Sequence, residues 1–251
     1  MIQDPLRSCK TYIEAQFRGI RSRAADAKAP FVTISRQAGA GGITIGRLLA
    51  RYLNERDGKN APAWTVFDKN LVAEVLKTYN LPEKCQEFMN EDKISEIDDI
   101  LAELFRLHPA KWTLVQKTTR TILHLSQLGH AILVGRGANV ITRKLHGGFH
   151  VRLVGSMTRR LRHLQEYYGF NSKQAADFIK SEDKGRKDYL KTYFDRNIDD
   201  PLLYDIIINT DFVSAEEAAH IIGRAVLSRK HGDESCLEES AVDSFAEGPS
   251  R

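Results

Sequence analysis

The chain of 251 residues carries a formal net charge of +4, and 42% of its residues are hydrophobic while 28% are charged. This composition is ordinary for a globular protein and excludes a disordered chain. The small net charge by itself gives no sign of a nucleic-acid-binding protein. Apolar runs fall far below the roughly 18 residues of a membrane-spanning helix, so we expect a cytoplasmic protein with no membrane or nucleic-acid partner.

The N-terminal part predicts a helix over residues 5–24, with an apolar stripe and a basic face. Pro30 ends this pattern, and FVTIS at 31–35 is a β-branched run typical of a buried strand. A glycine cluster follows, and the apolar spacing of residues 43–54 then predicts a helix. The order is therefore strand, glycine-rich turn and helix.

WTVF at 64–67 predicts a second strand, and Asp68 is placed to cap the helix that follows it. Residues 83–112 are polar and acidic with helical apolar spacing, which indicates an inserted helical lobe. A further amphipathic helix is expected over 113–128, and Gly129 ends it.

The second half of the chain continues the alternation of strands and helices. The expected strands are AILV at 131–134, FHVRLV at 149–154 and IIIN at 206–209. The expected helices are 158–168, 172–194 and a last helix that ends near Arg229. Ser214 and Glu217 form a capping box at the start of this last helix. Strands that alternate with helices predict an α/β fold whose parallel sheet is covered on both faces.

Three segments follow from these patterns. Residues 1–29 are a basic N-terminal helical extension, residues 30–230 are one domain, and residues 231–251 are an acidic tail that we expect to be disordered. Within the domain, residues 157–197 form a basic helical segment. The three cysteines have no metal-ligand spacing, so no metal site made of cysteine or histidine is expected.

The glycine loop, SRQAGAGGITIG at Ser35 to Gly46, suits a phosphate, because a glycine-rich turn exposes backbone N–H groups at a helix N-terminus. A complete phosphate loop reads GxxxxGK followed by Ser or Thr, and the matching positions here are Arg36, Gly41, Gly42 and Ile43. The usual lysine and magnesium-binding hydroxyl are therefore missing. Arg36 or an arginine from elsewhere is a candidate for the missing charge.

Two other interpretations of the loop stay open. A dinucleotide-binding loop needs a third glycine where Thr44 stands and an acid about 20 residues on, whereas Asp68 lies 27 residues after Gly41. The glycines could instead serve only the tight packing of strand against helix. Gly39 and the Thr44 hydroxyl favour phosphate binding.

Six ordered blocks of sequence together resemble the cytidylate kinase-like family. They are ISRQAGAGGITIGRLLA, FDKNL, LVGRGANVI, FHVRLVGSMTRRL, SEDKGRKDYLKTYF and DDPLLYDIIINTD, spread over residues 31–223. The resemblance implies a P-loop kinase-like fold of five parallel strands, with an NMP-binding lobe at about 83–112 and a lid at about 157–197. It also implies phosphoryl transfer from ATP, with Mg2+, to a nucleoside monophosphate, with CMP or dCMP favoured.

The same resemblance assigns the site residues. The lid arginines Arg160 and Arg186 are the expected catalytic groups, since phosphoryl transfer chiefly needs aligned phosphates and neutralised charge. Asp68, Arg136 and Asp183 are the expected substrate contacts, and Gly137 stands where cytidylate kinases carry an aspartate associated with the cytosine site. The expected nucleotide-phosphate contacts are Arg36, Gly39, Gly41, Gly42 and Thr44.

Plainer roles remain open for several of these residues. Asp68 is also a helix N-cap, Asp183 and Arg186 have the i,i+3 spacing of a surface ion pair, and Arg160 could lie on a solvated helix face. The missing lysine allows a second function, a nucleotide- or anion-binding module without catalysis. The basic N-terminal helix and acidic tail allow a third, a protein-interaction module.

Overall fold

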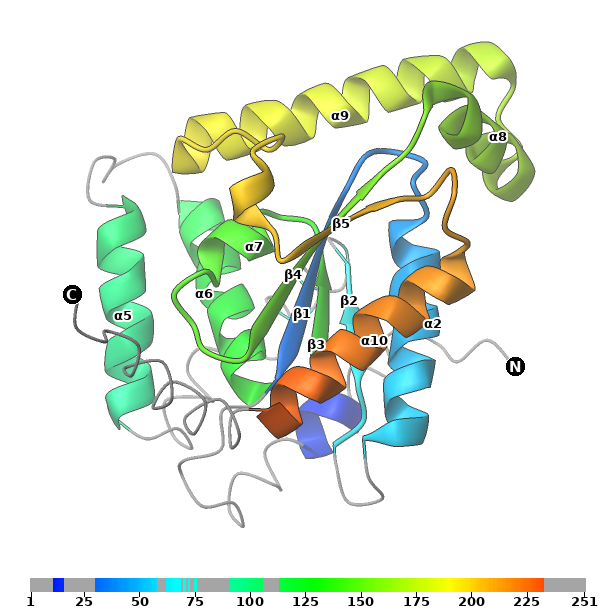
Figure 1. Cartoon of the computed structure of the whole chain (residues 1–251). Coiled ribbons are helices and arrows are strands. Elements are labelled where there is room, and N and C mark those ends of the chain that lie inside the picture. The colour runs from blue at the N-terminus through cyan, green and yellow to red at the C-terminus, as the bar shows by residue number, and fades with distance from the viewer. Residues whose placement is uncertain are drawn as a thin grey trace, which may run out of the picture.

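The computed structural model describes residues 11–15, 30–57, 62–68, 70, 72, 75, 91–105 and 113–232. Within them, five strands form one parallel sheet in the order β2-β3-β1-β4-β5 (Figure 1). The strands are β1 (Phe31–Arg36), β2 (Thr65–Phe67), β3 (Ala131–Val134), β4 (Gly148–Val154) and β5 (Ile206–Asn209). The predicted α/β class is confirmed, and every apolar run expected to be a strand is one.

Helices cover both faces of the sheet (Figure 1). On one face lie α2 (Gly42–Arg56) and α10 (Ala215–Gly232), and on the other lie α5 (Glu91–Phe105), α6 (Thr113–Leu128) and the short α7 (Ala138–Ile141). Alternate residues of β1 supply the two cores, with Val32 and Ile34 facing α2 and Phe31 facing α6. Because both faces are buried, the strands are continuously apolar, which is why their positions could be predicted.

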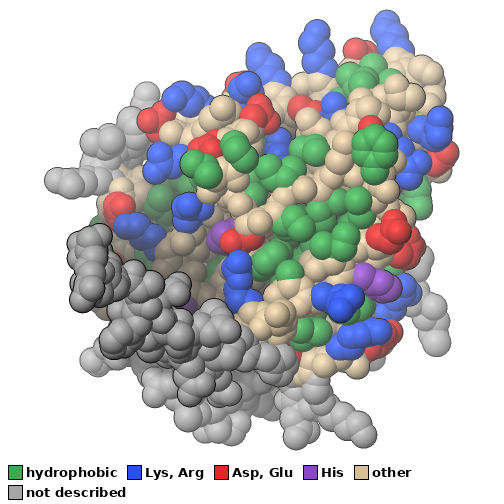
Figure 2. Space-filling model, in the orientation of Figure 1, with side chains coloured by type: hydrophobic (Ala, Val, Ile, Leu, Met, Phe, Trp, Pro, Cys, Tyr) green, Lys and Arg blue, Asp and Glu red, His purple; other side chains and the backbone are tan. Residues whose placement is uncertain are grey.

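Two helices lie across the carboxyl edge of the sheet, α8 (Met157–Tyr168) and α9 (Ser172–Phe194), followed by the 3-10 turn η1 (Pro201–Leu203) (Figure 1). Ser156 caps α8 by accepting the Arg159 N–H, and Asn171 begins α9 with a capping box. The pair has a small core of its own that includes Ala38 of the glycine loop. Lys and Arg side chains project outward from this layer (Figure 2). The predicted lid segment is thus docked on the loop.

Several predictions concern parts of the chain outside the described residues. Of the predicted N-terminal helix only residues 11–15 are described; they are helical, and the buried Tyr12 packs edge-on against Phe67 at 5.2 Å between ring centroids. Most of the acidic tail and parts of the lobe lie outside the described residues. No helix among the described residues has the length and apolarity needed to cross a membrane.

Two buried histidines predict an acid-sensitive fold. Burial lowers the pKa of His124 to about 4, helped by Arg120, and burial lowers the pKa of His150 to about 4 as well. An unfolded histidine titrates near pH 6.5, so the unfolded chain binds the extra proton first, and stability falls as the pH drops from about 6.5 towards 4. At pH 5 we expect each histidine to cost about 2 kcal/mol relative to pH 7.5.

Urea denaturation at pH 7.5 and pH 5.0 measures this loss. His124→Leu is expected to remove about half of the pH dependence, since leucine fills the apolar site without binding a proton. The exposed His146 supplies a matched control, because His146→Gln should leave the pH dependence as it is in the parent chain. An unchanged pH dependence in His124→Leu would contradict the assignment.

Candidate phosphate-binding site

The loop between β1 and α2 is shaped by glycines in the left-handed region. Gly39 has φ 80° and Gly41 has φ 75°, values that side chains other than glycine rarely adopt. Gly41 is the N-cap of α2 and offers no side-chain hydrogen bond, and the first turn of α2 contains no acidic residue. The backbone N–H groups at this helix end are therefore left for a ligand, and the helix dipole favours an anion there.

Close packing also requires glycine at position 39. A Cβ atom on Gly39 would lie 2.6 Å from the carbonyl oxygen of Arg160 and 2.9 Å from its Cβ. Both contacts are to the fixed first turn of α8 rather than to the end of a flexible side chain. The lid and the loop thus meet backbone to backbone at this point.

Asp183 and Arg160 hold the loop through Ala38. The Ala38 N–H donates to Asp183 Oδ1 at 2.6 Å, and Arg160 Nη1 donates to the Ala38 carbonyl at 3.3 Å. Arg160 also pairs with Asp183 Oδ2, and Arg186 Nη1 reaches Asp183 Oδ1 at 3.4 Å. One carboxylate on α9 therefore links the loop to two lid arginines.

Arg186 stands closer to the loop's open side. It donates to the Arg36 carbonyl at 3.3 Å and pairs with Glu182 at 2.8 Å. Burial lowers the pKa of Arg186, while Glu182 and Asp183 oppose that shift. Its positive charge is retained at neutral pH and lies beside the end of β1.

A pocket of about 200 Å3 lies between the loop, the start of α2 and the lid helices. Seven of the ten predicted site residues line it: Arg36, Gly39, Gly41, Gly42, Thr44, Asp68 and Arg186. They come from three separate stretches of the chain, the glycine loop, the end of β2 and α9. The pocket lies at the carboxyl edge of the parallel strands, where ligands of open α/β sheets bind.

The other three predicted residues, Arg160, Arg136 and Asp183, do not line this pocket. Arg160 is buried and engaged with Asp183 and Ala38, so in this arrangement both side chains support the loop from behind. Arg136 follows β3 in a left-handed conformation with φ 55° and is exposed. Their predicted roles in catalysis and substrate binding remain predictions.

Asp68 caps the helix that follows β2 and also lines the pocket. Its Oδ1 accepts the backbone N–H of Asn70 at 2.9 Å, which is the predicted cap, and its side chain also lines the pocket. The cap orients the carboxylate at the end of β2. A substrate contact by Asp68 stays a prediction.

The wall that the lid presents to this pocket was not predicted. It consists of His163, Leu164, Tyr168, Phe170, Phe178 and Glu182. A signal for part of it was available, since Phe178, Glu182 and Arg186 are spaced i, i+4 and i+8 and so share one face of α9. That spacing alone does not tell which face meets the loop.

The pocket does not offer a set of protein ligands for magnesium. Ile43 has no hydroxyl, Glu182 is paired with Arg186, and Asp68 is the other pocket-lining carboxylate. Among the described residues no group of three or more His, Cys, Asp and Glu side chains could hold a metal ion. The arginines are therefore the charge-neutralising groups that the chain itself supplies.

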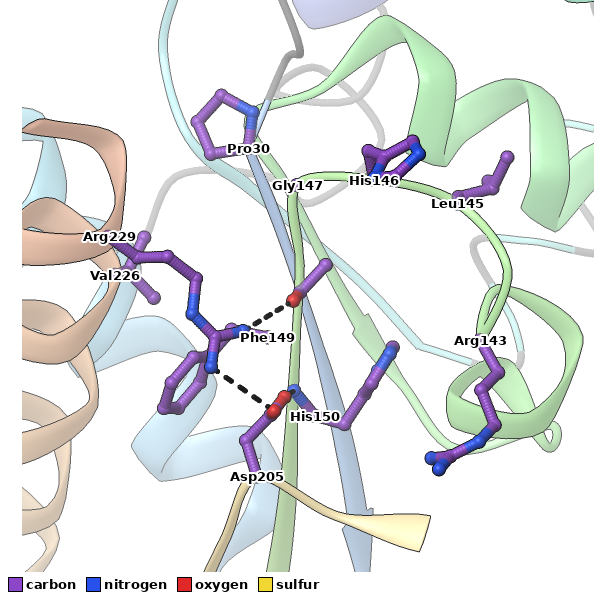
Figure 3. Close-up of a pocket in the computed structure, with 11 residues that line it drawn as sticks. Pro30, Arg143, Leu145, His146, Gly147, Phe149, His150, Asp205, Val226 and Arg229 are labelled. Carbon is purple, nitrogen blue, oxygen red and sulfur yellow. Dashed lines mark hydrogen bonds and ion pairs between the residues drawn. The ribbon is translucent and has the colours of Figure 1, made fainter. Parts of the chain in front are cut away.

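A larger pocket of about 470 Å3 opens at the opposite, amino end of the strands (Figure 3). Two arginines, Arg143 and Arg229, line it. Arg229 is already engaged, because it donates to the Gly148 carbonyl at 3.0 Å and to Asp205 at 3.2 Å and lies over the Phe149 ring. Size alone does not make this pocket the functional site, since it lacks the glycine loop and the uncapped helix end.

Sequence comparison finds a family match over most of the domain. The sequence model of the cytidylate kinase-like family matches residues 31–212, which include the loop, the sheet and the lid. The chain belongs to the cytidylate kinase-like family. A cytidylate kinase of Methanococcus aeolicus is 25% identical over 157 residues, covering 62% of this chain and 88% of that protein.

The fold is shared with a solved structure of an uncharacterised protein from Eubacterium ventriosum. The two chains superpose with a TM-score of 0.59 at 21% identity, over 80% of this chain and all of that one. At this identity the likeness concerns the fold only. Family membership and the topology of the sheet together support a P-loop kinase-like fold with a nucleotide kinase-like role.

Proposed function

We propose that the protein transfers a phosphoryl group from ATP to a nucleoside monophosphate. The observation that carries the proposal is the single pocket in which uncapped α2 N–H groups, Arg36 and Arg186 converge at the carboxyl edge of the sheet. Each of these groups suits phosphate oxygens. Membership in the cytidylate kinase-like family supports a kinase rather than another phosphate-binding protein.

Phosphoryl transfer asks the protein to align two phosphate groups and to neutralise the charge that develops on the transferred one. In our proposal the loop N–H groups and the Thr44 hydroxyl orient the donor phosphates, and Arg36 and Arg186 neutralise charge. Arg160 and Asp183 keep the loop in shape, so their contribution to the reaction is made through positioning. Arg136, at the end of β3, is the proposed contact for the acceptor.

The nucleoside is proposed to lie against the lid wall. Tyr168 and Phe178 are partly exposed and line the pocket, so they offer ring faces and edges to a base. CMP and dCMP are the first acceptors to test because of the family. We expect the base contacts to differ from those of cytidylate kinases. Gly137 stands where they carry an aspartate, and its φ of 68° and a Cβ placed 3.0 Å from Phe194 both disfavour a side chain there.

Turnover of a nucleotide panel tests the proposal. Purified full-length protein with ATP and Mg2+ should convert CMP, dCMP or another monophosphate to the diphosphate, measured by product chromatography. Asp195→Asn is a matched control on an exposed position of the lid, and it should keep the same turnover. Absence of diphosphate with every acceptor would overturn catalysis.

Binding without catalysis is the second candidate, and the apolar Ile43 at the magnesium-hydroxyl position is the observation in its favour. It predicts that calorimetry detects nucleotide binding that does not depend on magnesium, with no product formed. The family comparison does not favour this alternative. Running the two measurements on one preparation separates the candidates.

A further inference from the structure

Arg36 occupies the space that a lysine side chain at position 42 would need. A Cβ on Gly42 would lie 3.0 Å from Arg36 Cγ and 3.2 Å from Cδ, so the arginine's aliphatic stem runs directly over the first turn of α2. Gly42 has no left-handed φ that would require glycine. The absence of a side chain at 42 is therefore explained by the neighbouring arginine.

The guanidinium end of Arg36 lies against the end of β3. A Cβ on Gly135 would come within 2.2 Å of Arg36 Nη1, so this second glycine leaves room for the guanidinium. Arg36 thus reaches from the end of β1, past the loop, to the carboxyl end of the adjacent strand, and it lines the phosphate pocket.

This cation has no anionic partner of its own among the described residues. No hydrogen bond or ion pair of its guanidinium occurs within that part of the chain, whereas Arg186 and Arg160 each pair with a carboxylate. Burial, followed by the charge of Arg186, lowers the pKa of Arg36 to about 10, although the nearby carboxylates of Glu182 and Asp68 oppose the shift, so it stays protonated at neutral pH. Burying an unpaired charge beside another cation is unfavourable, and a bound polyanion would relieve that cost.

We propose that Arg36 is the replacement for the phosphate-loop lysine, and that the arginine at 36 and the glycine at 42 form one coupled exchange. In the usual loop a glycine stands at the first position and the lysine follows the last glycine. In this chain the charged residue, Arg36, stands at the first position, and a glycine, Gly42, stands at the lysine position. The inference rests on the proposed function for the identity of the ligand, a nucleoside triphosphate, and on the geometry of the loop for the role of Arg36.

Reversing the exchange tests the coupling. We expect Arg36→Gly to weaken binding of tripolyphosphate and of ATP about 10- to 100-fold, the usual effect of losing one charged hydrogen-bonding group. Gly42→Lys alone should also weaken binding, because its stem meets that of Arg36. The double variant R36G/G42K, which restores the usual order, should bind at least about tenfold more tightly than Arg36→Gly.

Controls keep the outcomes distinct. Arg36→Gln keeps the stem and removes the charge, so it serves if Arg36→Gly does not fold, which thermal unfolding would show. Arg51→Gln removes an exposed charge of α2 and should leave binding unchanged.

Calorimetry with tripolyphosphate reports on Arg36 whether or not any acceptor is turned over, so failure of the proposed kinase reaction leaves this measurement intact. Wild-type protein that binds no tripolyphosphate, an Arg36→Gln variant with wild-type affinity, or a folded double variant no better than Arg36→Gly would overturn the inference.

Discussion

Replacing Gly39 with alanine is expected to disrupt the phosphate site and to destabilise the protein by about 2 kcal/mol. Two effects combine, since the residue has φ 80° and its new Cβ would lie 2.6 Å from the Arg160 carbonyl oxygen. The loop or the start of α8 must shift to relieve the contact. The contact between the loop and α8 positions the loop N–H groups and the arginines proposed to bind phosphate. Nucleotide affinity should therefore fall at least about tenfold.

Gly185 provides a matched control for the same substitution. It lies within α9, and a Cβ placed there meets nothing within 4 Å, so Gly185→Ala should stabilise the protein by about 0.5 to 1 kcal/mol and leave affinity unchanged. Urea denaturation and calorimetry with ATP measure both variants. Gly39→Ala with the stability and affinity of the parent chain would contradict the close contact between loop and lid.

Asp183→Asn is expected to have an effect of similar size for a different reason. The carboxylate accepts the Ala38 N–H and pairs with Arg160 and Arg186, and an amide cannot balance two guanidinium charges. Arg160 is buried, so it would be left without its charged partner. We expect a loss of about 2 to 3 kcal/mol, less than for a fully buried pair because the Asp183 side chain is 28% exposed.

The loss of this link should also loosen the loop, so that ATP affinity falls while the affinity for a nucleoside alone changes little. Asp195→Asn is the control, because its ion pair with Lys191 is at the exposed end of the same helix and its left-handed conformation suits asparagine. If Asp183→Asn behaves like Asp195→Asn in both unfolding and binding, the carboxylate does not hold the loop.

Arg160 and Asp183 show where sequence reasoning about the site reached its limit. Arg160 was expected in catalysis and Asp183 as a substrate contact; in the structure both hold Ala38 and neither lines the pocket. Asp183 and Ala38 are 145 residues apart along the chain. The spacing of Asp183 and Arg186 correctly suggested a pairing within the helix, but not the contact with the loop. Whether a lid arginine faces a ligand or a backbone carbonyl depends on the docking of the lid.

The five strands, the glycine turn and most helix ends were determined by the sequence itself. They depend on local physics, namely apolar runs between turn residues, left-handed glycines such as Gly129, and capping boxes such as Ser214 with Glu217. These signals act within a few residues, so they can be recognised without the fold. The short α7 was missed because its four residues carry too little periodicity.

The packing of Arg36 against Gly42 and Gly135 was decided only by the tertiary structure. The sequence shows glycine at 42 and arginine at 36, yet nothing in their spacing tells that one side chain fills the space of the other, or that Gly135 completes the room for it. That arrangement exists because parallel pairing sets the end of β3 beside the end of β1. Contacts across a sheet are made between residues about 100 positions apart, and local sequence patterns carry no information about them.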